Sequence, residues 1–218
     1  MTIDIRYPLL MAMLLLSSII PTKAQTATDP YPDYLEETFM DMDFEPNLLT
    51  PPVPKTVVKE VAAYQKKTAL GLKSKILVDI MRDDDVFVAT IPTDDLFLPN
   101  DTLLHSYAAR KLDIVAGLMK DPYMYKVVIA IHTDDTGSEY YREKLSLARL
   151  NSIYDWIMDA IDEGTIPEEI VIIPFSMGSN EPLVANDTRK HRKENRRLEF
   201  YFIPGPKMIE LAKEHLLK

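Results

Sequence analysis

Two kinds of apolar pattern alternate between residues 75 and 204, and this alternation constrains the fold more than any other feature of the chain. Short runs of consecutive or alternating apolar residues predict strands, and longer segments with apolar residues every three or four positions predict helices. The predicted strands are KILVDI (75–80), VFVATI (86–91), YKVVIAI (125–131), EEIVIIPF (168–175) and RRLEFYFI (196–203). The predicted helices cover 55–72, 100–121 and 138–164.

This order of elements predicts one α/β domain. After an initial helix and an edge strand, the elements run strand, helix, strand, helix, strand, strand. Strands joined through helices favour right-handed crossovers, which place both helices on the same side of one sheet. We therefore expect residues 55–204 to form a two-layer α/β sandwich with the pattern βαβαββ, preceded by an extra N-terminal helix and edge strand.

The first 24 residues predict an export signal. Arg6 precedes an apolar run (YPLLMAMLLLSSII), and the small residues of TKA follow at the positions that a signal peptidase reads. The run is shorter than the roughly 20 residues that span a bilayer. We expect cleavage after Ala24, a periplasmic location and no transmembrane segment in the mature chain. An uncleaved signal anchor is the alternative.

Two further segments flank the predicted domain. Residues 25–54 are rich in Pro, Asp and Glu and end in TPPVP, a composition that buries too little surface to offset the entropy of ordering. We interpret them as an acidic, Pro-rich tether. Residues 205–218 (GPKMIELAKEHLLK) predict a short amphipathic helix, which covers a sheet edge or docks another envelope protein.

Charge and cysteine content exclude several classes of function. The chain has 34 acidic and 25 basic residues and a net charge of −9, so nucleic acid is a poor partner, despite the basic run RKHRKENRR at 189–197. There is no cysteine, so the chain forms no disulfide and carries no lipid on a cysteine. No nucleophile paired with a base, metal cluster or phosphate-binding loop is evident. We therefore expect no catalysis, no metal and no cofactor.

The stretch HTDDTGSEYYREKLSLAR, at 132–149, follows a predicted buried strand and combines acidic and basic side chains. Gly137 allows a tight turn, and Asp134 offers a negative charge suited to an ammonium group. Arg149 lies seven residues after Arg142, so both lie on one face of the predicted helix. Arginine binds carboxylates through two parallel hydrogen bonds. Together, an aspartate and an arginine match the zwitterionic head of an amino acid.

The same stretch allows other interpretations. Asp134 and Arg149 could form an internal ion pair that only closes the loop. The acidic and histidine residues of HTDD, together with His191, could be metal ligands of an exported hydrolase, although adjacent residues on a strand point to opposite faces. Tyr140 and Tyr141 could stack on a glycan, but packing at the start of the helix is the commoner role.

Four segments of the chain together resemble one known family. HTDDTGS, LSLAR and RKENRRLEF resemble, in order and spacing, the signature of the OmpA-like peptidoglycan-binding domain, the C-terminal domain of outer-membrane protein A. The preceding segment IPTDDLFLPNDTLL is similar to the entry segments typical of this family. The resemblance covers roughly residues 85 to 204. It implies non-covalent, non-catalytic binding of the diaminopimelate residue in the peptidoglycan stem peptide.

The resemblance also implies which residues bind this ligand. In the family, the Asp of the HTD segment holds the ligand ammonium and the Arg of LSxxR holds its carboxylate. These positions are Asp134 and Arg149 in this sequence. By motif position, Thr136, Asn100 and Arg196 would complete the site.

Two departures from the family pattern bear on this expectation. Arg142 stands where the family usually has Asn, and Ile131 where it has Gly. Arg142 could add a second carboxylate contact, or it could repel Arg149 and weaken the site. The implied function is to anchor the envelope, including its outer membrane, to the cell wall. The alternative is a periplasmic protein–protein interaction module that has lost or altered peptidoglycan binding.

Overall fold

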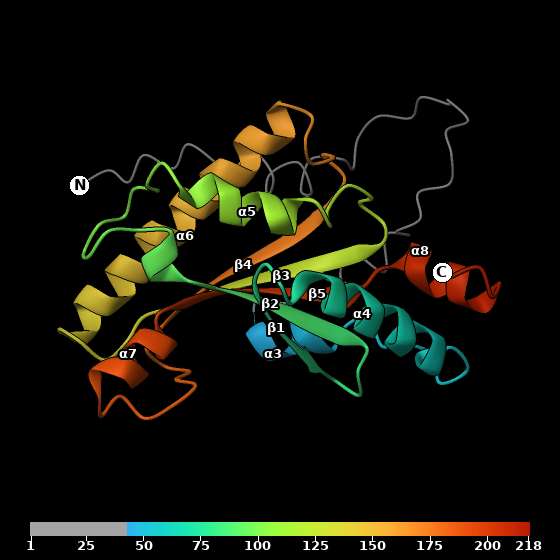
Figure 1. Ribbon diagram of the computed structural model, residues 1–218, viewed down its shortest axis with the longest axis horizontal. Helices are drawn as coiled ribbons and strands as arrows, with labels where there is room; N and C mark the ends of the chain where they lie inside the picture. The colour runs from blue at the N-terminus through green and yellow to red at the C-terminus, as the bar shows by residue number, and fades with distance from the viewer. Residues whose placement is uncertain (1–42) are drawn as a thin grey trace, which may run out of the picture.

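The computed structural model describes residues 43–218, in which five strands form one mixed sheet with the order β1-β2-β5-β3-β4 (Figure 1). Strands β1 and β2 form a hairpin, β5 lies antiparallel between β2 and β3, and β4 pairs parallel to β3. The predicted α/β fold class and order of elements are confirmed. The strands are β1 Leu77–Met81, β2 Val86–Pro92, β3 Tyr125–His132, β4 Val171–Gly178 and β5 Arg197–Pro204.

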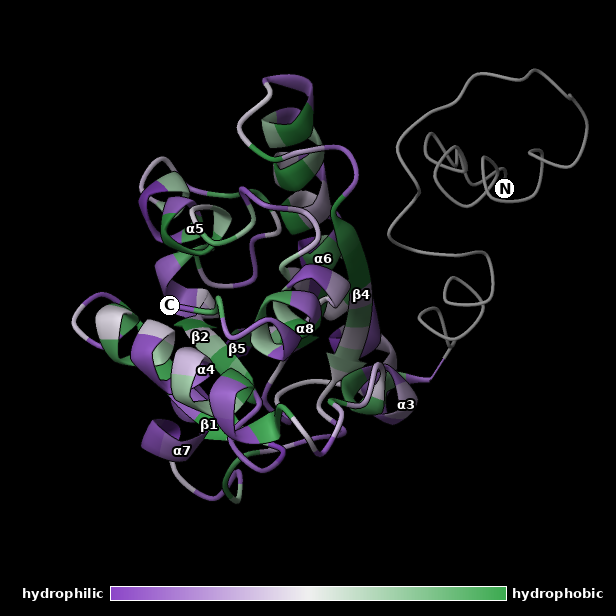
Figure 2. Ribbon diagram, turned by 90° about the vertical axis from the view of Figure 1, so that its right-hand side faces the viewer, coloured by the Kyte–Doolittle hydropathy of each residue, from purple (hydrophilic) through white to green (hydrophobic). Residues whose placement is uncertain are grey.

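The helices connect and cover these strands. Helix α5 joins β2 to β3, α6 joins β3 to β4 and packs on both, and α4 packs on β1 and β2 beside α8. Figure 2 shows mixed polar and apolar residues on α4, α6 and α8, as expected for helices that bury one face. No helix within residues 43–218 is long and apolar enough to cross a membrane. The helical segments are α3 Phe44–Leu49, α4 Val58–Leu72, the 3-10 turn η1 Thr93–Asp95, α5 Ala108–Ala116, α6 Glu139–Asp162, α7 Arg189–Asn195 and α8 Pro206–Lys213.

The main hydrophobic core lies between the sheet and these helices. Alternate residues of the central strands point into it, among them Val127 and Phe202, and they meet Leu112 of α5 and Ile153 of α6. All four are buried. The terminal helix α8 contributes Met208 to the same core, so the predicted C-terminal helix is present and packs against the domain.

A second, smaller apolar cluster lies on the opposite face of the sheet. It includes Val128 and Tyr201, and helix α3 covers it with the buried side chain of Leu48. Phe44 packs edge-on against Phe175 and Tyr201, with ring centroids 5.3 and 5.5 Å apart. The sandwich therefore has a partial third layer that the sequence pattern did not predict.

Part of the predicted tether belongs to the folded domain. The predicted signal peptide and residues 25–42 of the tether lie outside the described residues. Residues 43–54 instead form α3 and its following turn, where the ammonium group of Lys126 donates to Asn47 Oδ1 and to the Thr50 carbonyl, both at 3.1 Å. Composition missed this segment because its order comes from contacts with the sheet, which are distant in sequence.

Residues 97–107 form a loop where the sequence pattern predicted a helix from residue 100, and α5 begins only at Ala108. Asp101 accepts hydrogen bonds from the backbone N–H groups of Thr102 and Leu103 through its own side chain, which competes with helical hydrogen bonding. Asn100 adopts a positive φ of 59°, which is also incompatible with a right-handed helix. This loop supplies one side of the site described next.

Candidate functional site

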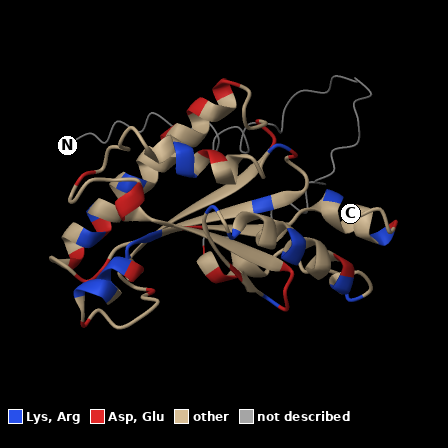
Figure 3. Ribbon diagram, in the orientation of Figure 1, with Lys and Arg blue, Asp and Glu red and all other residues tan. Residues whose placement is uncertain are grey.

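The candidate site lies at the end of the sheet where β3 ends and α6 begins. Turn η1, the loop after it and the junction between α7 and β5 meet there (Figure 1). Figure 3 shows acidic and basic residues gathered at this end of the molecule, around α7 and the start of α6. The fold thus brings together three segments of the chain that are distant in sequence, each carrying charge.

Asp134 is held at the start of the loop between β3 and α6. Its Oδ1 accepts a hydrogen bond from the backbone N–H of Thr136 at 2.9 Å, and its Oδ2 accepts one from Arg196 Nη1 at 2.7 Å. Burial opposes ionisation of Asp134, but the hydrogen bonds from Arg196 and Thr136 outweigh it and hold the pKa of this carboxyl below its usual range. Asp134 is therefore an ionised, oriented acceptor at neutral pH.

Arg196 is shared between two carboxylates. Besides its bond to Asp134, it donates from Nε to Asp94 Oδ1 at 2.9 Å and from Nη2 to Asp94 Oδ2 at 2.8 Å. The side-chain hydrogen bonds from Arg196 also lower the pKa of Asp94. Asp94 was not among the predicted site residues. Its position in the TDD segment, shortly before the loop that carries Asn100, is the signal that could have indicated it.

Arg149 projects from α6 and is almost fully buried, with 4% of its surface exposed. Its Nε donates to the Asp101 carbonyl at 2.9 Å, its Nη2 donates to the Leu98 carbonyl at 3.3 Å, and its guanidinium lies 4.9 Å from the centre of the Phe97 ring. No hydrogen bond from its Nη1 is found among residues 43–218. The ion-pair partner of Asp134 is Arg196 rather than Arg149, so the interpretation as an Asp134–Arg149 loop closure finds no support.

Arg142 binds the loop rather than its neighbour on the helix. Its Nη1 donates to the Gly137 carbonyl at 2.6 Å and to the Asp135 carbonyl at 3.3 Å. Ser138 caps the same helix by accepting from the N–H of Tyr141. These bonds fix the loop that carries Asp134 against the first turns of α6.

Tyr141 connects two parts of the site, although sequence reasoning favoured only a packing role for it. Its hydroxyl donates to Asn100 Oδ1 at 3.1 Å. Its ring lies against Gly137, because a Cβ added there would meet the ring at 2.9 Å. The predicted residues Asn100 and Thr136 are thus both near this helix start, and all six predicted residues fall within one connected neighbourhood.

The residues considered as metal ligands do not converge. His132 is buried on the other face of the sheet, where its Nε2 lies 2.9 Å from Glu199 Oε2. His191 pairs with Asp187 at 2.6 Å. Within the part of the chain that the structure describes, no group of three or more His, Asp or Glu side chains is arranged to hold a metal ion.

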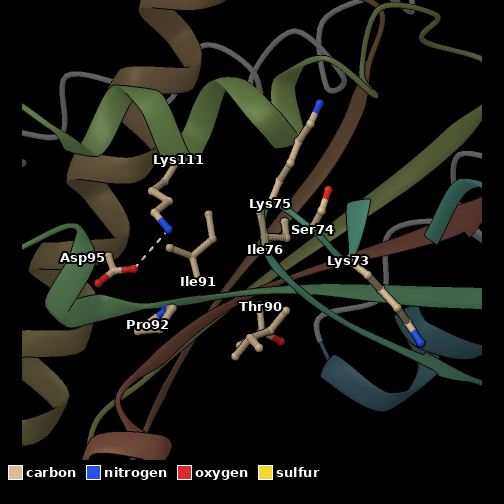
Figure 4. Close-up of a pocket in the computed structure, with 10 residues that line it drawn as sticks. Lys73, Ser74, Lys75, Ile76, Thr90, Ile91, Pro92, Asp95 and Lys111 are labelled. Carbon is tan, nitrogen blue, oxygen red and sulfur yellow. Dashed lines mark ion pairs between the residues drawn. The ribbon is translucent and has the colours of Figure 1, made fainter. Parts of the chain in front are cut away.

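A separate groove of about 380 Å³ lies between the loop after α4, strand β2 and α5 (Figure 4). Three lysines line it, but their charges do not converge on one point. Lys111 pairs with Asp95 at 3.4 Å, while Lys73 and Lys75 extend in different directions. The groove therefore lacks the fixed, convergent donors that the site around Asp134 has.

Comparisons with known proteins agree with this architecture. Residues 96–196 match the family model described as the OmpA family. The Escherichia coli (strain K12) protein YfiB is 31% identical over 104 residues, which cover 47% of this chain and 62% of that protein's length. This match therefore leaves more than a third of YfiB without a counterpart.

Two solved structures match part of this chain. A MotB-like protein from Desulfovibrio vulgaris has a TM-score of 0.55 and 21% identity, with 67% of this chain and 95% of that chain covered. The cell wall anchor of the T6SS from Pseudomonas aeruginosa has a TM-score of 0.48 and 20% identity, with 66% and 96% covered. At these identities the likeness is one of fold, and only the first score is high enough to support that conclusion.

Proposed function

Because residues 96–196 form a domain of the OmpA family, we propose that the chain binds peptidoglycan non-covalently through this domain and thereby anchors the cell envelope to the wall. The proposed location is the periplasm, in association with the outer membrane. The proposed ligand is the side chain of diaminopimelate in the stem peptide, whose far end carries both an ammonium group and a carboxylate. The domain acts as a binding module without catalysis.

The observation that carries this proposal is the fixed placement of Asp134 and Arg149 around one loop and helix. Asp134 keeps lone pairs on both carboxylate oxygens beyond its bonds to Thr136 and Arg196, so it can accept from an ammonium. Arg149 is oriented by the Leu98 and Asp101 carbonyls, which leaves its Nη1 for a carboxylate. Both groups are pre-organised, so little side-chain entropy is lost on binding.

This geometry predicts discrimination between two kinds of cell wall. Lysine, the other common diamino acid at this position, ends in an ammonium group alone. It could satisfy Asp134 but would leave Arg149 without a carboxylate. A site built for a hydrogen-bonding group rejects ligands that lack it, because its own buried donors stay unpaired. We therefore expect strong preference for diaminopimelate.

Calorimetric titration of the full chain tests this proposal. The ligand is a synthetic stem peptide with diaminopimelate, compared with the same peptide containing lysine. Asp134→Asn keeps the size of the side chain and should weaken binding about 100-fold, because a charge-assisted bond in a partly desolvated site is lost. Asp135→Asn is the matched control, because Asp135 is exposed and its ion pair with Arg192 is long, at 3.7 Å. Absence of binding by a folded wild-type chain would contradict the proposal.

One observation favours the alternative of a protein–protein interaction module. In this structure Asp134 already holds Arg196, and Arg149 has only 4% of its surface exposed. A chain that folds and binds no stem peptide would support that second function. Since α8 buries Met208 and Ala212 in the core, the N-terminal tether is then the better candidate for docking another envelope protein.

A further inference from the structure

The arrangement around Arg196 contains one more acidic group than an internal ion pair needs. Asp94 and Asp134 supply two carboxylates, and Arg196 supplies one guanidinium, with all three contacts between 2.7 and 2.9 Å. Asp94 takes the two parallel bonds of the guanidinium and Asp134 takes a single one. The cluster therefore keeps one net negative charge, which the arginine alone does not neutralise.

Arg196 cannot easily move away from this cluster. Its carbonyl accepts a hydrogen bond from the N–H of Thr93 at 3.1 Å, next to Asp94 in the same turn. The following residue, Arg197, is the first of β5 and lies in register with Pro92 of β2. Because the sheet fixes the backbone of Arg196, its guanidinium stays between the carboxylates of Asp94 and Asp134. The two carboxylates therefore compete for hydrogen bonds from the same positive charge.

A ligand ammonium would compete with Arg196 for Asp134. Oδ1 of Asp134 accepts from the Thr136 N–H, and Oδ2 accepts from Arg196, so an incoming ammonium must share these oxygens. With Asp94 present, the guanidinium has a second partner, which accepts two of its hydrogen bonds. Without Asp94, Arg196 and Asp134 would form a closed, neutral pair that offers an ammonium little attraction.

From this geometry we infer that Asp94 is a positioning residue that holds Arg196 and so keeps the charge of Asp134 available to the ammonium group of a ligand. This inference rests on the proposed function and deepens it, because it assigns the selection for an amine to a residue that does not touch the ligand. It also explains the shared arginine as part of the binding site, where a simple ion pair would have needed only one acid.

Titration with a matched pair of ligands tests the role of Asp94. The first ligand is the stem peptide with diaminopimelate, and the second is the same peptide with the terminal amine acetylated. Asp94→Asn should weaken binding of the first about tenfold, the effect of losing one charge beside a charge-assisted bond, and should leave the second unchanged. Asp95 is the neighbour of Asp94 in the same turn, and within residues 43–218 its ion pair is with Lys111, so Asp95→Asn should change neither affinity.

A double-mutant cycle separates positioning from direct contact. In an Arg196→Gln background there is no guanidinium to hold, so adding Asp94→Asn should change affinity for the amine ligand less than about twofold. An equal loss in both backgrounds would overturn the inference, because Asp94 would then act directly or through the fold. An equal loss for the acetylated ligand would overturn it as well.

The outcomes also separate this inference from the proposed function. If the folded wild-type chain binds neither peptide, the proposed function fails. If it binds the amine peptide and Asp94→Asn binds equally well, only the inference about Asp94 fails. Urea unfolding of each variant confirms that the titrations compare folded chains, and Asp94→Ala offers a second substitution if Asp94→Asn does not fold.

Discussion

Two neighbouring arginines, Arg196 and Arg197, pair with acids in different environments. Arg196 keeps 27% of its side chain exposed and is shared by two aspartates at the sheet end. Arg197 keeps 5% and lies on the sheet face opposite α6, where its Nε donates to Glu199 at 2.8 Å. Tyr201 donates to the same glutamate at 2.8 Å.

The difference between the two clusters is one of role. A partly exposed ion pair is weakened by water and salt, so the loss of one such pair changes stability little. A buried pair that loses one partner leaves a charge without compensation in a medium of low dielectric, which costs several kcal/mol. The cluster of Arg196 is therefore suited to accepting a ligand beside it, and the cluster of Arg197 to holding β5 in the fold.

The largest expected effect comes from breaking the buried cluster. Arg197→Met should lower the free energy of unfolding by about 3 kcal/mol, because Glu199 stays buried without its guanidinium partner. Arg196→Met, the matched control, should lower it by less than about 1 kcal/mol. Urea unfolding measures both. Equal losses for the two variants would refute the division of roles between the neighbours.

Acid should affect the buried cluster next. Burial opposes ionisation of Glu199, but hydrogen bonds from His132 and Arg197 outweigh it and lower its pKa from 4.5 to about 2. The unfolded chain thus takes up a proton at higher pH than the folded chain, so the stability from Glu199 is present above pH 4.5 and is lost as pH falls toward about 2. Burial also lowers the pKa of His132, so the unfolded chain binds a proton at this residue more readily than the folded chain. His132 therefore also makes the fold less stable as the pH falls.

Glu199→Gln provides the measurement for this pH dependence. The variant should be less stable than wild type at neutral pH, and its free energy of unfolding should decline less between pH 4.5 and 2. Urea titrations at a series of pH values supply both curves. Parallel curves for variant and wild type would show that other acids cause the acid sensitivity.

The sequence predicted the fold more fully than it predicted the site. The five strands and the long helix α6 were predicted because their apolar periodicity is local, and Asp134 and Arg149 were proposed as ligand residues because they lie within one short motif. Asp94 was missed, because its pairing with Arg196 crosses 102 residues of the chain. Such a contact exists only once the sheet has formed.

Local pattern also failed where side chains replace helical hydrogen bonds. The loop around Asp101 has the apolar spacing of a helix. Its non-helical conformation is stabilised by the hydrogen bond from the Thr102 N–H to the Asp101 side chain and by the bond from Arg149 to the Asp101 carbonyl. Helix α3 was read as tether because its few apolar residues gain their order from the sheet. In both segments a tertiary contact outweighed propensity.

A moderate effect is expected from a substitution in the loop between β3 and α6, which carries Asp134. Gly137 has a φ of +87°, and a Cβ there would meet the Tyr141 ring at 2.9 Å, so Gly137→Ala should cost about 1 kcal/mol of stability and weaken stem-peptide binding. Gly164→Ala is the control, because its φ is +72° but nothing lies within 4 Å. It should cost similar stability without changing affinity. Equal affinities for both variants would show that the contact between Gly137 and Tyr141 does not affect ligand binding.

The smallest effect is expected in the lysine-lined groove. Lys111→Ala removes an ion pair with Asp95 that is about 40% exposed, so stability should change by less than about 0.5 kcal/mol. Stem-peptide affinity should stay the same, as calorimetry would measure. A clear loss of affinity would extend the binding surface from the sheet end into the groove.

The most direct measurement is a crystal structure of the full chain with the diaminopimelate stem peptide bound. We predict that the ligand ammonium lies within hydrogen-bond distance of Asp134, that its carboxylate contacts Arg149, and that Arg196 remains on Asp94. A peptide bound elsewhere, or bound at the sheet end with its ammonium group beyond hydrogen-bond distance of Asp134, would contradict this account of the site.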